Sequence, residues 1–310
     1  MSKHITESDV IWKDGTFVPW GETRVHLLSL AVQFGTSIFE GIRCYDTPRG
    51  PAIFRLKEHI RRLFDSCAIY RMVPEHTPED IERACRATVS ENGLRDCYLR
   101  PMVLRGYGSA GLDPSASPIE SYVAAWPWGT YLGPEALERG VDVCTSSWTR
   151  AAPNTFPVAA KAAGHYTNAQ LIKMQALADG YVEGIALGPG GLVSEGSGQN
   201  LFLVRGGTLI TPFLDGTSLA GITRDAVITL ADDLGIPMRE QHVPRESLYV
   251  VDELFFTGTA SEVTPIRSVD RIEVGGGVAG PITLRLQRAF LETVKGIAED
   301  GHGWLTLVED

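Results

Sequence analysis

The 310-residue chain has no long apolar run, and this absence excludes one class of protein. No stretch approaches the roughly 18 apolar residues that a membrane-spanning helix needs. The N-terminal stretch MSKHITESDV is polar and lacks the apolar centre of a signal peptide. Together these absences predict a soluble, cytoplasmic protein that makes no membrane contact.

Metal-binding and disulfide patterns are missing as well. The five cysteines form no CxxC pair and are odd in number, and the seven histidines show neither HxxxH nor HxH spacing. Such spacings are typical of zinc sites, and paired cysteines of disulfide-stabilised folds. We therefore expect no metal site and no disulfide framework.

Positive charge is also scarce. The chain has 28 Lys and Arg residues against 38 Asp and Glu, which gives a formal net charge of −10. Nucleic-acid phosphates are repelled by such a balance, so a nucleic-acid partner is excluded as the main function. With 44% hydrophobic and 21% charged residues, the composition is that of an ordinary globular protein of one large or two medium domains.

Short strand-like runs alternate with amphipathic helical runs, which predicts a mixed α/β or α+β fold. The stretch VIWKDGTFVPW predicts a hairpin that turns at Asp14-Gly15. Further on, apolar spacing predicts two helices, the second ending at Gly93, and two strands. These helices are expected at residues 56–72 and 78–93, and the strands at 98–104 and 122–126.

The segment WPWGTYLGPEALERG interrupts this alternation with prolines and glycines between strand-like runs. Such a composition is typical of a connection between domains. We therefore predict a small N-terminal domain at 1–129, an interdomain loop at 130–140 and a large C-terminal domain at 141–310.

Lys161 lies in AAKAAGHYTN, where its close neighbours are all small. Thr167 and Gln170 have the spacing of a capping box, which predicts a helix from there to about Asp179 and places Lys161 in the preceding loop. Apolar surroundings favour the neutral, nucleophilic amine, and small neighbours leave room for a bulky adduct, as a Schiff-base lysine requires. The alternative is a lysine that extends from the loop into water.

Glu195 follows a strand-like run and lies between glycines, in LVSEGSGQN. Gly196 and Gly198 would let the backbone approach a ligand closely, although an exposed acid in a turn fits the same pattern. A dinucleotide-binding loop does not fit, because GSGQN is followed by the strand-like LFLV and not by a helix.

Two further segments have the features of anion sites. Thr223 opens a predicted helix over 221–235, where free N–H groups and the helix dipole favour a phosphate, or where the threonine simply caps the helix. The turn at 258–261 follows a predicted strand at 253–257 and also offers N–H groups.

Two arginines complete the set of candidates. Arg62 faces nearly opposite Ile60 and Phe64 on a helical wheel, which predicts a solvated side chain. Arg100 lies in an apolar strand and needs a partner, such as a substrate carboxylate. An amine, an acid and anion-binding turns are what a phosphorylated aldehyde cofactor requires.

Several long motifs in this sequence are similar to those of one family. The chain resembles the branched-chain amino acid aminotransferases, which carry pyridoxal 5'-phosphate on fold type IV with two mixed α/β domains. The motifs are FGTSIFEGIRCY, EHIRRL, AAWPWGTYLG, SSWTRAAPNTFPVAAKAAGHY, EGIALGPGGLVSEGSGQNLF, LAGITRDA and FTGTASEVTPI.

The resemblance assigns roles around the cofactor. Lys161 would form the internal aldimine and would move a proton at the substrate α-carbon. Glu195 would pair with the pyridine nitrogen and Tyr166 with the ring hydroxyl. The residues implied for the phosphate are Arg62, Ile222, Thr223 and Thr259.

The resemblance also implies a site that accepts amino acids and 2-oxo acids. The α-carboxylate would be held by Tyr98 with the backbone of Thr259 and Ala260, and the distal carboxylate of glutamate or 2-oxoglutarate by Arg100. The pocket for the substrate side chain and the further substrate contacts would be formed by Phe39, Arg43, Trp128 and Tyr131. Relatives of this kind imply a homodimer or a higher homo-oligomer.

Two departures from the family pattern concern substrate range. Phe34 stands where a tyrosine is usual, and Ser109-Ala110 stand where relatives carry larger residues. A larger pocket would extend activity to bulky substrates, (R)-amines or D-amino acids, as in other transaminases of this fold. The sequence is also compatible with a lyase of the same fold, a nicotinamide-dependent oxidoreductase and a non-catalytic carrier of the cofactor.

Overall fold

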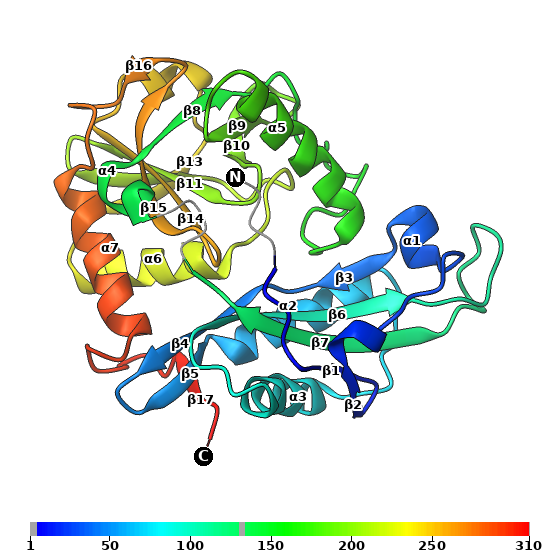
Figure 1. The fold of residues 1–310 in the computed structure, drawn as a ribbon. Helices are drawn as coiled ribbons and strands as arrows, with labels where there is room; N and C mark the ends of the chain where they lie inside the picture. The colour runs from blue at the N-terminus through cyan, green and yellow to red at the C-terminus, as the bar shows by residue number, and fades with distance from the viewer. Residues whose placement is uncertain (1–4, 130–133, 310) are drawn as a thin grey trace. The chain divides into compact units, whose positions relative to one another are not determined.

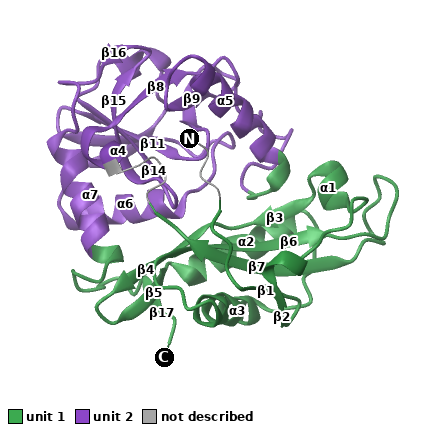
Figure 2. Ribbon diagram, in the orientation of Figure 1, with its two compact units in different colours: residues 1–129, 160–164, 293–310 green, residues 130–159, 165–292 purple. Residues whose placement is uncertain are grey.

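The computed structural model describes residues 5–129 and 134–309. These residues form two compact units (Figure 2). Unit 1 comprises the described residues of 1–129, 160–164 and 293–310, and unit 2 those of 130–159 and 165–292. Two segments that the sequence prediction placed in the C-terminal domain therefore belong to unit 1.

The reason for this difference is pairing between distant segments. Strand β17 (Leu305–Leu307) pairs with β5 (Gly50–Phe54), and Ala162 forms a bridge with Ile38. Such long-range pairing leaves no local pattern in the sequence. The predicted loop at 130–140 also differs, because it contains helix α4 (Pro134–Arg139).

Unit 1 is built on one antiparallel sheet, ordered β17-β5-β4-β6-β7-β1-β2 within the described residues, with β3 also paired to β6 (Figure 1). Its remaining strands are β1 (Val10–Lys13), β2 (Thr16–Pro19), β3 (Ser37–Phe39), β4 (Ile42–Thr47), β6 (Cys97–Arg105) and β7 (Ile119–Pro127). Its helices are α1 (Leu30–Phe34), α2 (Leu56–Ile69) and α3 (Pro78–Glu91).

The predicted hairpin and second helix of unit 1 are confirmed, whereas the first helix, predicted at 56–72, ends at Ile69. Lys13 pairs with Thr16, which leaves Asp14 and Gly15 as a two-residue turn in which both have positive φ. Helix α3 begins after a capping box formed by Thr77 and Asp80, and Gly93 lies just beyond its end at φ +60°.

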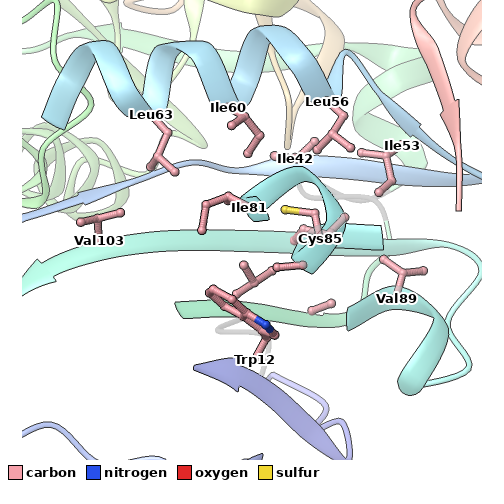
Figure 3. Close-up of a cluster of buried hydrophobic side chains, with 14 of the residues drawn as sticks. Trp12, Ile42, Ile53, Leu56, Ile60, Leu63, Ile81, Cys85, Val89 and Val103 are labelled. Carbon is pink, nitrogen blue, oxygen red and sulfur yellow. The ribbon is translucent and has the colours of Figure 1, made fainter. Parts of the chain in front are cut away.

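The two faces of this sheet have different roles because side chains alternate along each strand. On β6, Leu99 and Val103 face the core, in which three α2 side chains, Leu56, Ile60 and Leu63, are fully buried (Figure 3). Burying each of these side chains contributes about 1.5–3 kcal/mol. The alternate β6 residues, Tyr98 and Arg100, therefore lie on the opposite face.

Unit 2 contains a mixed sheet in the order β10-β9-β8-β15-β14-β11-β12-β13, with β16 paired to β15, within the described part of the chain. Its strands are β8 (Val141–Thr145), β9 (Glu183–Leu187), β10 (Val193–Gly196), β11 (Asn200–Arg205), β12 (Thr208–Pro212), β13 (Met238–Gln241), β14 (Glu253–Gly258), β15 (Glu262–Val269) and β16 (Ile272–Glu273). Besides α4, its helices are α5 (Tyr166–Ala178), α6 (Ile222–Asp233) and most of α7 (Pro281–Val294).

The predicted mixed α/β fold is confirmed by these two units. The capping box predicted at Thr167 is wrong. Helix α5 begins at Tyr166, its N-cap is His165, and a short 3-10 turn precedes it, so Thr167 already lies inside the first turn. No helix among the described residues is long and apolar enough to cross a membrane.

Candidate active site

Lys161 lies in a loop of unit 1, as the sequence predicts. Hydrogen bonds hold the backbone of this loop on both sides of the residue. Its backbone N–H donates to Ser66 Oγ of α2 at 3.0 Å. Its carbonyl oxygen accepts from the N–H of Phe39, at the end of β3, at 3.1 Å. The next residue, Ala162, pairs with Ile38 of the same strand. The backbone at Lys161 is therefore held by a helix and a strand of the same unit.

Packing explains the small residues around this lysine. Ala160 and Ala162 are 1% and 2% exposed, and Ala162 belongs to the core of unit 1. At Gly35, an added Cβ would lie 3.2 Å from the Gly164 Cα, so the chain approaches itself closely there. Ala160 and Ala162 are therefore small because the loop packs closely on unit 1.

An arginine lies among aromatic rings on the sheet face opposite the core. The Arg100 guanidinium carbon is 4.6 Å from the ring centroid of Phe39, 5.5 Å from that of Tyr98 and 5.9 Å from that of Trp126. Its Nε is buried and has no hydrogen-bond partner among the described residues. The Tyr98 ring also lies 4.8 Å from that of Trp128. Cation–π contacts of this kind hold a guanidinium without neutralising it.

The Phe39 ring connects this arginine to the lysine. Lys161 Nζ lies 5.1 Å from the centroid of the ring that Arg100 also contacts. Phe39, Tyr98, Arg100, Trp128 and Lys161, all predicted site residues, are thus brought together in unit 1. Trp126 was not predicted. The sequence contains an indication of its position, because Trp126 alternates with the core-facing Ala125 in a predicted strand. In the structure it is the strand partner of Tyr98.

A glycine makes room for the tyrosine of this group. A Cβ added at Gly41 would lie 1.8 Å from the Tyr98 Oη, far inside van der Waals contact. Gly41 directly precedes β4, which pairs with the strand that carries Tyr98. The glycine of the FEGIR stretch is therefore required by the packing of a predicted substrate residue.

Arg62 of α2 is not solvated, so the prediction from the helical wheel is wrong. Its Nε and Nη2 donate to the two carboxylate oxygens of Glu40 at 2.7 and 2.8 Å. The side chain points away from the hydrophobic core and toward a buried acid. A helical wheel shows only that a side chain faces away from the core, and not whether it meets solvent or another buried group there. Neither Glu40 nor its second partner, His59, was predicted, although both lie in the quoted motifs.

Glu40 is fully buried and ionised. Burial, the largest single influence, would raise the pKa of the carboxyl, but the charge of Arg62, the interaction with His59 and the hydrogen bonds from both residues together outweigh it and hold the pKa well below its ordinary value. His59 Nδ1 lies 2.7 Å from Glu40 Oε2. Burial lowers the pKa of His59, so this imidazole is neutral near pH 7 and donates from Nδ1.

Arg43, a further residue predicted from the resemblance, is the strand partner of Tyr98. Arg43 Nη2 donates to Asp96 at 2.8 Å, and its guanidinium stacks over the Tyr45 ring. Phe34, at the end of α1, and Ala110 are exposed. Tyr131 lies outside the described residues.

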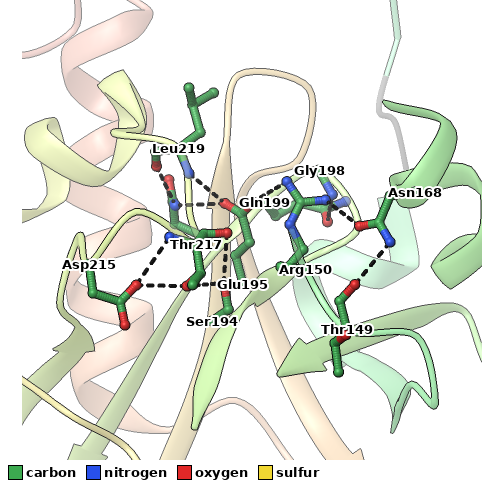
Figure 4. A network of polar contacts seen from close by, with 11 residues as sticks. Thr149, Arg150, Asn168, Ser194, Glu195, Gly198, Gln199, Asp215, Thr217 and Leu219 are labelled. Atoms are coloured by element: carbon green, nitrogen blue, oxygen red, sulfur yellow. Dashed lines mark hydrogen bonds and ion pairs between the residues drawn. The ribbon is translucent and has the colours of Figure 1, made fainter. Parts of the chain in front are cut away.

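In unit 2, Glu195 is buried at the end of a strand within a set of donors (Figure 4). Its Oε2 accepts from the Leu219 N–H at 3.1 Å and from Asn200 Nδ2 at 3.3 Å. Its Oε1 lies 2.7 Å from Arg150 Nη2. The prediction of an exposed acid in a turn is therefore wrong, and the carboxylate is held in a defined orientation.

Besides Asn200, the sequence reasoning missed Arg150 of this set. It is 8% exposed, and its backbone N–H donates to Leu187 O in β9. Its side chain also reaches the first turn of α5, where Nη1 donates to Asn168 Oδ1 at 3.1 Å. The available signal was its place in the motif SSWTRAAPN, shortly before the lysine loop.

Two features of unit 2, the start of a helix and a pair of buried hydroxyls, could hold an anion. Helix α6 begins after Gly221 without a side-chain cap, so Thr223 is its second residue and not its N-cap. At the end of β14, which α6 contacts, the buried hydroxyls of Thr257 and Ser261 have no hydrogen-bond partner among the described residues. Donors without partners beside an uncapped helix start suit a phosphate.

The remaining predicted residues also lie in unit 2. Ile222 is the first residue of α6, Tyr166 is the first residue of α5, and Thr259 and Ala260 form the half-buried turn between β14 and β15. Among the described residues, no group of three His, Cys, Asp or Glu side chains is placed to hold a metal ion.

Comparison with known proteins identifies the family. The model of amino-transferase class IV matches residues 37–269. The chain is 50% identical over 303 residues to the branched-chain-amino-acid aminotransferase of Escherichia coli strain K12, covering 97% of this chain and 98% of that one. The chain belongs to the class IV aminotransferases, in the branched-chain group. The predicted family, its fold type IV and the predicted enzyme class are thereby confirmed.

Other members of the branched-chain group are similar over the same length. The enzyme of Pseudomonas aeruginosa is 44% identical over 97% of both chains. The crystal structure of the Escherichia coli aminotransferase has a TM-score of 0.96 and 49% identity, and covers 98% of this chain and 100% of its own. The aminotransferase of Thermobaculum terrenum, solved in its PLP-form, has a TM-score of 0.91 and 36% identity, covering 98% and 99%. Aminotransferases of class IV depend on pyridoxal 5'-phosphate, the predicted cofactor.

Proposed function

We propose that this chain transfers the amino group between a branched-chain L-amino acid and 2-oxoglutarate. Lys161 would hold pyridoxal 5'-phosphate through its amine. The same amine would accept the proton of the substrate α-carbon and give it back within the site. These roles deepen the family assignment, which by itself gives only the reaction class.

The observation that carries the proposal is the group formed by Lys161, Phe39 and Arg100. A branched alkyl chain needs apolar walls, which Phe39 and the neighbouring rings provide beside the amine. The distal carboxylate of glutamate needs a cation, which Arg100 provides among the same rings. Because the guanidinium is held by aromatic faces, it is available to an acidic substrate and compatible with an apolar one.

The residues of unit 2 fit the cofactor. Glu195 offers a carboxylate for the protonated ring nitrogen, and Tyr166 a hydroxyl for the ring oxygen. The start of α6, with Thr223, and the unpartnered hydroxyls beside the turn at Thr259 suit the phosphate. When bound, the cofactor supplies an electron sink for the charge that develops at the α-carbon. Arg62 would contribute to the phosphate only through N–H groups that do not face Glu40.

A substrate panel tests this function. The purified protein is assayed with leucine, phenylalanine and (R)-1-phenylethylamine as donors and with 2-oxoglutarate or pyruvate as acceptor. We expect the highest kcat/KM for leucine with 2-oxoglutarate. Preference for the (R)-amine, or transfer to pyruvate alone, would contradict the proposal. A function as an (R)-amine or D-amino acid transaminase is not favoured by the relatives described above.

We further propose that the enzyme works as a homodimer or a larger homo-oligomer. Three apolar side chains near α1, Leu27, Leu28 and Val32, are between 50% and 74% exposed. Adjacent exposed apolar residues are typical of a surface that is covered by a partner. Light scattering coupled to size-exclusion chromatography measures the mass directly, and a monomer of 33.7 kDa at working concentration would refute this proposal.

A further inference from the structure

We infer that Arg150 is a positioning residue that keeps the Glu195 carboxylate ionised. The site thereby prefers a cofactor whose ring has a nitrogen facing this carboxylate over one whose ring has carbon there. The inference rests on the proposed function, because it assigns Glu195 to the ring nitrogen of the cofactor. It concerns a residue that acts through Glu195 and need not touch the cofactor itself.

Burial is the first step in the argument. Glu195 is 4% exposed and Arg150 is 8% exposed, so both charged groups are removed from bulk water. A carboxylate without a cation in such a place favours its neutral form. The Arg150 Nη2, at 2.7 Å from Oε1, provides the opposite charge that reverses this preference.

Two further donors orient the carboxylate. The Leu219 N–H donates to Oε2 (Figure 4). Asn200 Nδ2 donates to the same oxygen. Both donors are neutral, so they orient the carboxylate but stabilise its charge less than a guanidinium does. Arg150 is therefore a partner whose charge favours the ionised form of Glu195.

The proton between Glu195 and a ring nitrogen can reside on either partner. An ionised carboxylate with a protonated ring places a negative charge next to Arg150 and a positive charge farther away. The neutral alternative offers Arg150 no such interaction. Arg150 thus favours the protonated ring, which is the form that withdraws electrons from the substrate.

Arg150 also joins the two ends of the cofactor site in unit 2. Its Nη1 donates to Asn168, whose Nδ2 in turn donates to the Thr149 carbonyl at 3.0 Å. Asn168 lies in the first turn of α5, two residues after Tyr166. The same guanidinium therefore connects the acid for the ring nitrogen to the helix that carries the donor for the ring hydroxyl.

The test measures binding of the apoprotein to pyridoxal 5'-phosphate and to its analogue with carbon in place of the ring nitrogen. The ratio of the two Kd values reports the contribution of the nitrogen. We expect the wild type to prefer the natural cofactor by about tenfold or more, the equivalent of one unit of proton affinity. Arg150→Met should remove most of this preference, and Arg150→Lys should keep most of it.

Two controls separate this effect from a structural one. Arg267→Met removes an arginine–aspartate pair elsewhere in unit 2 and should leave the ratio unchanged. In a Glu195→Gln background, Arg150→Met should not change the ratio further, because the group through which it acts is gone. Circular dichroism and thermal unfolding show whether each variant is folded, and Arg150→Lys provides the test if Arg150→Met is not.

Three results overturn the inference. The first is an unchanged ratio of Kd values in Arg150→Met. The second is a loss of preference in Arg150→Lys as large as that in Arg150→Met. The third is a wild-type protein that transfers the amino group from leucine but shows no preference for the cofactor with the ring nitrogen. In the last case the proposed function stands. A wild type that transfers no amino group from any donor of the panel overturns the proposed function instead.

Discussion

Replacing Glu40 by glutamine tests how far unit 1 depends on its buried charges. In the wild type the carboxylate is fully buried and bonds to two partners, Arg62 and His59. Glutamine has nearly the same shape but carries no charge and has one acceptor oxygen in place of two. The substitution therefore leaves the Arg62 guanidinium, whose side chain is 14% exposed, without its counter-charge.

The magnitude follows from this geometry. Removing one partner of a buried ion pair destabilises a protein by about 3–5 kcal/mol. Because glutamine keeps one acceptor, we expect Glu40→Gln to lose about 3 kcal/mol, at the lower end of that range. For a unit of this size, about 2–4 °C per kcal/mol gives a fall in Tm of roughly 6–12 °C.

The loss also has a defined pH dependence. Glu40 has a lower pKa in the folded protein than in the unfolded chain, so its contribution is complete above the unfolded value of about 4.5 and is lost as the pH falls below it. The buried His59 also has a lowered pKa, so its neutral form starts to cost stability below about pH 6.5. Glu40 raises the pKa of His59 through its charge and its hydrogen bond, so Glu40→Gln should lower that pKa further. The difference in Tm between wild type and Glu40→Gln should therefore widen between about pH 6.5 and pH 4.5 and shrink only below about pH 4.5.

Thermal unfolding followed by circular dichroism between pH 3 and pH 8 measures both effects. The matched control is Asp46→Asn, which breaks the ion pair of Asp46 with Arg95 in the same unit. Both of these side chains are largely exposed, so the control should melt close to the wild type. The reasoning is refuted if Glu40→Gln melts within about 1 °C of the wild type at neutral pH, or if Asp46→Asn falls as far.

Three further substitutions address the site itself. Lys161→Ala should abolish amino transfer while the far-UV spectrum is retained, because the loop is held through its backbone; wild-type turnover would disprove the role of this amine. Arg100→Met should raise the KM for glutamate by about tenfold or more while that for leucine changes less, since a charged hydrogen bond is worth about 1.5–3 kcal/mol; equal changes for both substrates would contradict it. Gly41→Ala should displace the Tyr98 ring, lower kcat/KM for leucine and cost about 1–3 kcal/mol of stability, as chemical denaturation measures; an unchanged enzyme would show that the tyrosine yields without cost.

Much of unit 1 could be predicted from local sequence. The Asp14-Gly15 turn needs positive φ at both positions, which a short sequence signals directly. Helices α2 and α3 follow from apolar spacing, and α3 also from its cap. These elements were predictable because the interactions that specify them are made between residues close together in the chain.

The environment of each site residue was less predictable. A helical wheel gives the direction of Arg62 relative to the core of its own unit, but not the presence of Glu40 on the other side. Composition shows that Ala160 and Ala162 are small, but not that they are buried. The partner in each case comes from a distant part of the chain, and Arg150 was missed beside Glu195 for the same reason.

The sequence by itself determined the class of fold, the family, the cofactor and the position of Lys161 in a loop, because local spacing and long motifs carry that information. Only the tertiary structure decided that Lys161 and Arg100 lie close to the same Phe39 ring. It also decided that Arg150 pairs with Glu195 and that Glu40 pairs with Arg62. A charge can be buried only where an opposite charge or a set of donors meets it. Which groups meet is settled by the pairing of strands and helices that lie far apart in the chain.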